Sequence, residues 1–416
     1  MSLMTCPCSP DDKPARLGVI LPVLLEAVTP ITETESVPLA SALGRSLAEP
    51  VITSADVPPL NNAAMDGYAF AVEYLRPEHD TTLPVFARIA AGHPLTAMLP
   101  PGHAVRIFTG AAMPAGADTV ATQEQCRAGA GTVTVPAGIV RGANVRRAGD
   151  DLARGSVALP AGRRLRPADL GLAAAAGAPR LTVYRQLRVA VFSTGDELRE
   201  PGQGGAPGTL HDSNRYTLLG LLEQAGCKTT DLGILPDRPE VITETMLRAA
   251  NNHDAVITSG GMSVGDEDHI RAALTAAGGR IDHWRLAIKP GKPVGIGTLG
   301  RVLFLGLPGN PAAVVVTFLL VARPLLLRLA GSNDEDWPRV HAMANFSYTR
   351  TPGRREYLAA DLRQDGDSGA LVVLRGKQGS HILSGLAAAD ALVELPENCG
   401  IVRPGDPVTV LPLFMP

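Results

Sequence analysis

The stretch AVITSGGMSVGDED, residues 255–268, decides the fold of the central part of the chain. It begins with an apolar run that is typical of a buried strand. Three glycines and several acidic residues follow, and a helical pattern then extends from Glu267 to Ala277. A strand, a flexible loop and a helix in this order are typical of an α/β domain, in which such a loop lies at the carboxyl end of a strand. The glycines leave backbone N–H groups free to turn toward a ligand, and a phosphate or another oxyanion suits them.

The same alternation continues on both sides of this stretch. Five apolar runs predict buried strands, and longer patterns between them predict helices. The strands are RVAVFST, TTDLGIL, DAVITS, PVGIGTL and RVLFLGL, and the helices span residues 214–225, 239–251, 267–277 and 311–330. This order predicts a doubly wound α/β domain with a mostly parallel sheet over residues 187–332.

The remainder of the chain is richer in turns. Helices are expected over residues 17–28, between Pro38 and Pro50, and within the Ala-rich segment 160–179, while short alternating runs predict strands before residue 146 and after residue 332. We therefore expect a fold of the α/β plus β class in an elongated chain. Its parts are a helical and extended N-terminal domain (residues 1–57 and 145–186), a small β-domain (58–144), the α/β domain (187–332) and a C-terminal β-barrel-like domain (333–416).

Composition narrows the class of protein. Of 416 residues, 45% are hydrophobic and 19% are charged, which excludes a disordered chain. The net charge of −3 gives no overall attraction to nucleic acid or to an anionic membrane, so neither is expected as a partner. Arg323, Pro324 and Arg328 interrupt the long apolar run from Ala312, which we interpret as a buried helix and not as a membrane span. The chain does not open on a signal-peptide pattern, and a cytoplasmic location is expected.

The cysteines favour a reducing compartment. There are five of them, an odd number, and they lack paired metal-ligand spacing. Free thiols are therefore expected. A metal site at Cys6 and Cys8 is the alternative for that pair.

Polar residues follow four of the predicted strands. They are Thr194-Gly195-Asp196-Glu197, Asp237, the loop of residues 259–268, and Pro308-Gly309-Asn310-Pro311. Ligands of open α/β sheets bind at this edge. Carboxylates beside a phosphate are unfavourable unless a cation intervenes, so these acids favour Mg²⁺. Ordinary turns or helix caps are the alternative for Ser263 and Asp266.

Two further segments carry candidate ligand-binding residues, each of which also has a purely structural explanation. IKPGKP, residues 288–293, places two lysines on a stiff loop, where they either hold an oxyanion or lie solvated. Asp66 in NNAAMDGYA and Thr109 in IFTGAAMP lie near predicted strand ends. Asp66 is otherwise a turn former.

Eight motifs together resemble a known family. In their order along residues 17–416 they resemble those of the molybdopterin molybdenumtransferases, the MoeA-like molybdenum insertases related to the gephyrin E domain. The motifs are NNAAMDGYA, RIFTGAAMPAGADTV, VRRAGDD, FSTGDEL, SGGMSVGDED, KPGKP, LPGNP and PGRREY. The resemblance implies an elongated dimer whose active site lies between the α/β domain of one subunit and the small β-domain of the other. It also implies transfer of molybdate to adenylylated molybdopterin, with Mg²⁺-dependent hydrolysis of the phosphoanhydride and release of AMP.

The resemblance also implies roles for individual residues. The implied catalytic residues are Asp66, Thr109, Asp151, Glu197, Asp237 and Asp268, of which Glu197, Asp237 and Asp268 hold the metal. The implied substrate-binding residues are Ser259, Gly260, Gly261, Ser263, Lys289, Lys292, Pro308, Gly309, Asn310, Arg354 and Ser380. The first motif departs from the family pattern at Leu60, Asn61 and Ala63, which puts the local wall of the cleft in doubt.

Partners and rival functions follow from the same resemblance. The implied partners are a second copy of the chain, the molybdopterin adenylyltransferase and factors that mature molybdoenzymes. One rival function is the adenylyltransferase itself, whose family has a single α/β domain and a different glycine loop. The other is a scaffold without catalysis, which could dispense with the acids that this chain retains.

Overall fold

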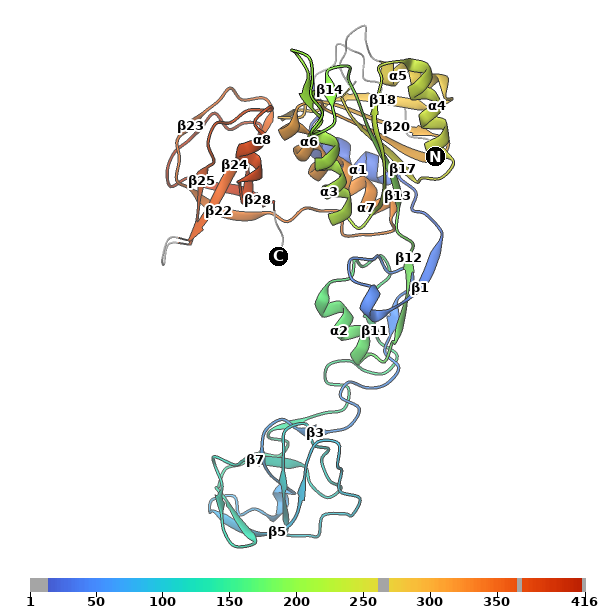
Figure 1. Cartoon of the computed structure of the whole chain (residues 1–416). Coiled ribbons are helices and arrows are strands. Elements are labelled where there is room, and N and C mark those ends of the chain that lie inside the picture. The colour runs from blue at the N-terminus through green and yellow to red at the C-terminus, as the bar shows by residue number, and fades with distance from the viewer. Residues whose placement is uncertain (1–13, 261–268, 365–368, 414–416) are drawn as a thin grey trace.

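The chain forms an elongated structure with two thick parts at one end and one small part at the other (Figure 1). The computed structural model describes residues 14–260, 269–364 and 369–413. The α/β part and the C-terminal β part lie side by side, and a narrow stalk connects them to the small β part (Figure 1). The predicted site residues Gly261, Ser263 and Asp268 therefore lie outside the described residues.

The α/β part is built on a six-stranded sheet with the order β16-β13-β17-β21-β20-β18. Four strands run parallel: β16 (Lys228–Leu235), β13 (Arg188–Thr194), β17 (Ala255–Ser259) and β21 (Val302–Leu307). β20 (Pro293–Leu299) and β18 (Arg280–Arg285) are antiparallel. The expected mostly parallel sheet is confirmed. The edge strand β18 was not predicted, because RIDHWR mixes charged with apolar residues.

Helices cover both faces of this sheet. α3 (Asn214–Gln224), α6 (Pro311–Thr317), α7 (Arg323–Leu329) and α1 (Leu17–Ala27) contribute to the larger core, and α4 (Pro239–Ala250) and α5 (His269–Ala276) to the second. The doubly wound fold is thus confirmed. A π-helical turn, η3 (Phe318–Ala322), joins α6 to α7.

The helical run Pro311–Leu329 is long and apolar enough to cross a membrane, so its arginines and proline do not shorten it as the sequence argument assumed. However, 94% of it is buried inside the protein. The expectation of a buried helix is confirmed by this packing.

The stalk contains little helix. It consists of the strand pairs β1 (Thr34–Pro38) with β12 (Arg180–Tyr184) and β2 (Val51–Ile52) with β11 (Val157–Leu159), together with α2 (Pro167–Ala175). The helix predicted between Pro38 and Pro50 is wrong, since only the 3₁₀ turn η1 (Leu39–Ser41) forms there. Gly44 follows with a φ of 73°, and the Leu47 N–H bonds across to Arg163 O instead of continuing a helix.

The small β part and the C-terminal part are both β-structures. In the small part a six-stranded arrangement has the order β7-β4-β6-β5-β9-β8. Its elements are β3 (Asn62–Ala63), β4 (Gly67–Phe70), η2 (Val72–Tyr74), β5 (Thr81–Ile89), β6 (Ala104–Ile107), β7 (Thr119–Thr122), β8 (Arg127–Ala128), β9 (Thr132–Val135) and β10 (Val145–Arg146).

The C-terminal strands have the order β19-β24-β25-β22-β28-β26, and an additional pairing of β24 with β26 closes them into a barrel. The barrel-like expectation is confirmed. β19 (Ile288–Lys289) is the exception in this sheet, because it belongs to the α/β part and joins it to the barrel. Its other strands are β22 (Val340–Ala344), β24 (Arg355–Gln364), β25 (Ala370–Leu374), β26 (Ala391–Leu395) and β28 (Pro407–Pro412). The C-terminal part also contains α8 (Leu383–Ala387) and the separate strand pair β23 (Tyr348–Thr349) with β27 (Ile401–Val402).

Three of the five cysteines can be assessed. Cys126, Cys227 and Cys399 are free, as expected. Burial raises the pKa of the Cys227 thiol to about 12, so this thiol stays protonated and unreactive near neutral pH. Cys6 and Cys8 lie outside the described residues.

Candidate active site

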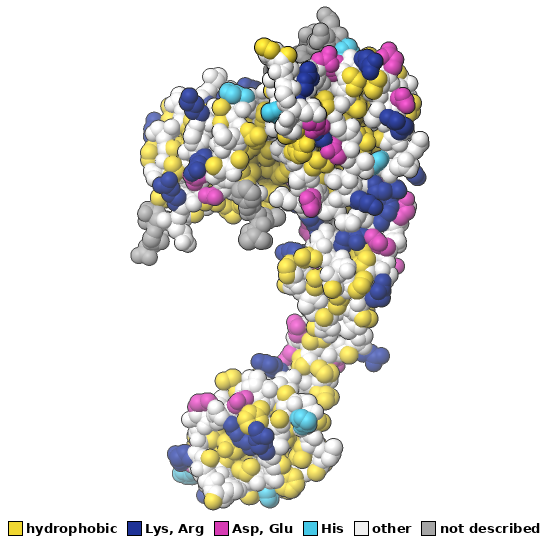
Figure 2. All heavy atoms as spheres, viewed as in Figure 1, with side chains coloured by type: hydrophobic (Ala, Val, Ile, Leu, Met, Phe, Trp, Pro, Cys, Tyr) yellow, Lys and Arg dark blue, Asp and Glu magenta, His cyan; other side chains and the backbone are white. Residues whose placement is uncertain are grey.

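A cavity of about 1010 Å³ lies between the α/β part and the C-terminal barrel. Figure 2 shows the hollow between these two parts, with apolar side chains gathered in it. Ten of the residues singled out from the sequence line this cavity: Glu197, Asp237, Gly260, Lys289, Lys292, Pro308, Gly309, Asn310, Arg354 and Ser380. The carboxyl ends of the parallel strands supply one wall, and the barrel supplies the other. The tertiary structure thus brings together residues up to 183 positions apart in the chain (Glu197 to Ser380).

Glu197 and Asp237 follow the neighbouring strands β13 and β16. Gly195, with a φ of 146°, makes room for Glu197, because a Cβ there would lie 2.7 Å from Glu197 Oε2. Burial, followed by the charge of Asp196, raises the pKa of Asp237, and Glu197 adds to this while His269 opposes it. The carboxylates therefore repel one another. A bound cation would relieve that repulsion. The described residues contain no group of three metal-ligating side chains, but two carboxylates are compatible with Mg²⁺ when substrate phosphates and water supply its other ligands.

The raised pKa of Asp237, caused first by burial, predicts an effect on stability. A raised pKa means that the folded state holds the proton more tightly than the unfolded chain, so the ionised carboxylate destabilises the fold above that pKa. Asp237→Asn is expected to raise the midpoint of thermal unfolding at pH 7 by on the order of 1 °C in metal-free buffer. The gain should shrink as the pH falls toward 4, where aspartate becomes protonated. A gain of the same size at pH 4 and pH 7, measured by calorimetry, would contradict this account.

Asn214, a residue not singled out from the sequence, connects two of the strand-end loops beside the cavity by hydrogen bonds. Its Nδ2 donates to Ser259 Oγ (2.9 Å) and to Gly309 O (2.7 Å). Ser259 Oγ in turn donates to Pro308 O (3.2 Å) and is 3% exposed, so Ser259 supports the loops and does not line the cavity. Asn214 directly follows Ser213 at the start of α3, a pattern that the sequence presents only as a helix start.

The glycines let two of the strand-end loops approach closely. Gly260 has a φ of 93°, and a Cβ there would lie 3.2 Å from Thr194 O. A Cβ on Gly309 would lie 3.7 Å from Gly260 Cα. Both glycines line the cavity, so the backbone of each loop faces it at a position without a side chain.

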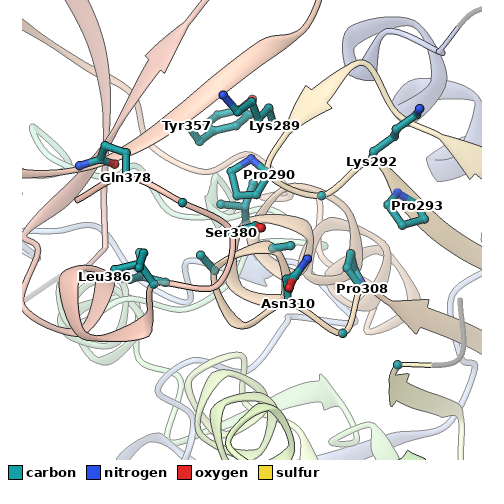
Figure 3. Close-up of a pocket in the computed structure, with 18 of the residues that line it drawn as sticks. Lys289, Pro290, Lys292, Pro293, Pro308, Asn310, Tyr357, Gln378, Ser380 and Leu386 are labelled. Atoms are coloured by element: carbon teal, nitrogen blue, oxygen red, sulfur yellow. The ribbon is translucent and has the colours of Figure 1, made fainter. Parts of the chain in front are cut away.

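The two lysines of IKPGKP have different environments. Lys289 Nζ lies 2.7 Å from Glu356 Oε1. Within the described parts of the chain, no ion pair compensates Lys292, which is exposed on the cavity wall. Figure 3 shows Lys289 beside Tyr357 and Lys292 on the other side of Pro290. Lys292 therefore carries the available positive charge of this loop.

Glu356 organises the barrel side of the cavity. It is 2% exposed, forms an ion pair with Arg350 (Oε2 to Nε, 3.1 Å) and accepts a hydrogen bond from Tyr348 OH (3.0 Å). Burial, together with the hydrogen bond to Glu356, raises the pKa of Tyr348 to about 12. Tyr348 thus acts as a hydrogen-bond donor there. The barrel contacts α6 where the Ala312 N–H donates to Ser380 O (3.0 Å).

Asp66, Thr109 and Asp151 lie away from this cavity. Asp66 Oδ1 accepts hydrogen bonds from Thr109 N (2.8 Å) and Thr109 Oγ1 (2.7 Å), and these bonds, the backbone one first, lower the pKa of Asp66. Asp151 lies in the connection back to the stalk, where its N–H donates to Val57 O. The structure thus brings Asp66 and Thr109 together in the small β part, at the far end of the stalk from the cavity (Figure 1).

The departures from the family motif leave the loop before Asp66 well held. Asn61 Oδ1 accepts from Ala148 N (2.9 Å), and Ala63 is fully buried. Leu60 is 61% exposed and is thus available to a neighbouring surface.

A doubly wound α/β domain with acidic and glycine loops at its strand ends, joined to a barrel and a stalked β-domain, defines a multidomain protein with a ligand-sized cavity at the carboxyl ends of its strands. Three family models cover most of the chain: the MoeA N-terminal region, domains I and II, matches residues 19–177; a probable molybdopterin binding domain matches 190–328; and the MoeA C-terminal region, domain IV, matches 341–413.

Relatives and solved structures agree with these matches. The chain is 38% identical to a molybdopterin molybdenumtransferase of Haemophilus influenzae, over 94% of this chain and 96% of that protein. It is also 38% identical to one from Nostoc sp., over 92% and 89%. The crystal structure of the molybdopterin biosynthesis MoeA protein from Pyrococcus horikoshii matches with a TM-score of 0.79 and 30% identity, over 96% of this chain and all of that one. The chain belongs to the molybdopterin molybdenumtransferase (MoeA) family of transferases.

Proposed function

We propose that this chain inserts molybdate into adenylylated molybdopterin in the biosynthesis of the molybdenum cofactor, with Mg²⁺-dependent hydrolysis of the phosphoanhydride and release of AMP. The observation that carries the proposal is the cavity itself. It combines two bare glycine loops, two mutually repelling carboxylates and an uncompensated lysine. Family membership supports the choice of substrates. We place the reaction in the cytoplasm.

The proposal assigns a role to the carboxylates, the glycine loops and the lysine of the cavity. Glu197 and Asp237 would hold Mg²⁺, with Asp268 as a further ligand from outside the described residues. The metal, when bound, would neutralise negative charge on the phosphoanhydride. The loops around Gly260 and Gly309 bind the pyrophosphate through their backbone, and Asn214 fixes their separation. Lys292, with Arg354 and Ser380 from the barrel side, binds the molybdate oxyanion.

The proposal includes a homodimer with shared active sites. Asp66 and Thr109 lie too far along the stalk to reach the cavity of their own chain (Figure 1). A second copy related by two-fold symmetry would bring its Asp66 and Thr109, with Asp151, to this cavity. The adenylyltransferase that supplies the substrate and the factors that receive the product are further proposed partners.

AMP release from adenylylated molybdopterin, with and without molybdate, tests the function. The insertase is expected to release AMP only with both molybdate and Mg²⁺ present. An adenylyltransferase would instead consume ATP and molybdopterin, and a scaffold would do neither. Absence of AMP release under all conditions would refute the proposal.

Lys292 gives a sharper prediction about molybdate. Lys292→Ala is expected to weaken molybdate binding by about 10- to 100-fold, because a charge-assisted contact contributes about 1.5–3 kcal/mol. AMP binding should change little, since adenine depends on packing and hydrogen bonds. The matched control is Lys289→Ala, whose ammonium is paired with Glu356 and should matter less for molybdate. Calorimetric titrations that give equal losses for both ligands, or for both variants, would place the oxyanion elsewhere.

A further inference from the structure

We propose that Arg215 is a positioning residue that fixes the separation of the segments carrying Glu197 and Asp237, and thereby the affinity for the metal. This inference rests on the proposed function, in which those two carboxylates hold Mg²⁺. Arg215 does not line the cavity. Its effect is transmitted through three carboxylates that it contacts.

Arg215 is the largest fully buried side chain of the described residues, with 2% exposure. Each nitrogen of its guanidinium has a carboxylate partner. Nε donates to Asp212 Oδ2 (3.0 Å), Nη2 donates to Glu200 Oε1 (2.5 Å), and Nη1 donates to Asp231 Oδ2. The Arg215 N–H also donates to Asp212 Oδ1 (3.1 Å), which anchors the start of α3. The side chain has no freedom left to adjust.

Glu200 connects Arg215 to the segment that carries Glu197. It lies three residues after Glu197, next to β14 (Leu198–Arg199), which pairs with β15 (Leu210–His211). The Leu210 N–H donates to Glu197 O (2.9 Å), so the position of this strand pair sets the position of the Glu197 backbone. Tyr216 OH supports the same carboxylate through Glu200 Oε2 (3.0 Å).

Asp231 connects Arg215 to the segment that carries Asp237. It lies on the edge strand β16, six residues before Asp237. Asp231 Oδ1 also accepts from the Gly233 N–H (2.9 Å), and Gly233 has a φ of 76° in a region where the β13–β16 register shifts. One guanidinium therefore joins the irregular part of β16 to the Glu197 segment.

The charges explain why an arginine is required. Three carboxylates, Glu200, Asp212 and Asp231, converge on one cation. Without that cation they would repel one another, and the segments attached to them would move apart. A lysine provides one compact charge and cannot donate in three fixed, coplanar directions. Arg215→Lys is thus expected to hold the two segments less well, even where the chain still folds.

The test measures metal binding and segment mobility separately. The main variant is Glu200→Gln, which weakens only the tie to the Glu197 segment at a side chain that is 34% exposed and is therefore expected to fold. Arg215→Lys is the second variant, and Glu223→Gln, an exposed carboxylate on the same helix, is the matched control. Mn²⁺ serves as the probe, titrated by electron paramagnetic resonance. Hydrogen exchange is followed over residues 198–211 and 228–237.

We expect Glu200→Gln to weaken Mn²⁺ binding by about 10- to 100-fold, the usual effect of losing a residue that orients metal ligands. Exchange over residues 198–211 should become faster, while Glu223→Gln resembles the wild type in both measurements. In turnover, saturating Mg²⁺ should largely restore kcat, because the ligands themselves remain.

Two results would overturn the inference, and they differ in what else they overturn. Faster exchange with unchanged Mn²⁺ affinity, in both Glu200→Gln and Arg215→Lys, would show that the Arg215 cluster only stabilises the fold. Unchanged Mn²⁺ binding in Glu197→Gln would show that the metal is held elsewhere, and it would overturn both the proposed metal site and the role of Arg215.

Discussion

Glu197→Gln is expected to lower the rate of AMP release by about 10²- to 10⁴-fold, the usual cost of removing a metal ligand or an acid–base group. The substitution keeps the shape of the side chain that lies against Gly195, so the chain should fold normally. It removes one of the two charges proposed to hold the metal, and the repulsion on Asp237 falls. Turnover is measured with adenylylated molybdopterin, molybdate and Mg²⁺.

The matched control for this variant is Glu244→Gln. Glu244 is an exposed carboxylate on α4, with 73% of its side chain accessible, and it has only a long contact of 3.9 Å with Arg248. The Glu244→Gln variant should release AMP at the wild-type rate. Wild-type turnover by Glu197→Gln, or an equal loss in the control, would remove Glu197 from the reaction.

The second large effect is recovery of activity when two inactive chains are mixed. Asp66→Ala and Glu197→Ala should each be inactive alone, because in the proposed homodimer every site of either variant lacks one acid. In a mixed dimer one site carries both changes and the other carries neither. With random reassortment about half of the dimers are mixed and half of their sites are intact, so activity should approach about a quarter of that of the wild type.

The outcome depends on where the chain places Asp66. The cavity is lined by the α/β part and the barrel, and Asp66 lies beyond the stalk. Mass spectrometry must first establish that mixed dimers have formed. If they have and activity does not return, Asp66 either serves the same site as Glu197 from one chain or is only the turn former that accepts from Thr109.

Much of the α/β part could be predicted from the sequence, for a simple physical reason. Strands buried on both faces are continuous apolar runs, as in β17 and β21, and these runs stand out in a chain with many turns. The carboxyl ends of parallel strands meet at one edge, so the sequence predicts that Glu197, Asp237, Gly260 and Gly309 lie near one another. The structure lines one cavity with all four.

Elements without such a strong pattern were missed. β18 is an edge strand with charged residues. The segment between Pro38 and Pro50 has a helical composition, yet it forms only a 3₁₀ turn. Pairing with the distant segments around Arg163 and Thr182 stabilises its backbone instead. Tertiary hydrogen bonds thus outweighed local propensity there.

The sequence by itself determined most strands and helices of the α/β part and which of its strand ends carry polar groups, because both follow from local patterns. Only the tertiary structure decided which charges are compensated. Glu356 pairs with Lys289 and not with Lys292, and Arg215 contacts three carboxylates from separate segments. Only the tertiary structure also showed that Asp66 lies with Thr109 in the small β part and not at the cavity. Ion pairing depends on distances of a few ångströms between residues far apart in the chain, and such distances are set by packing and not by local pattern.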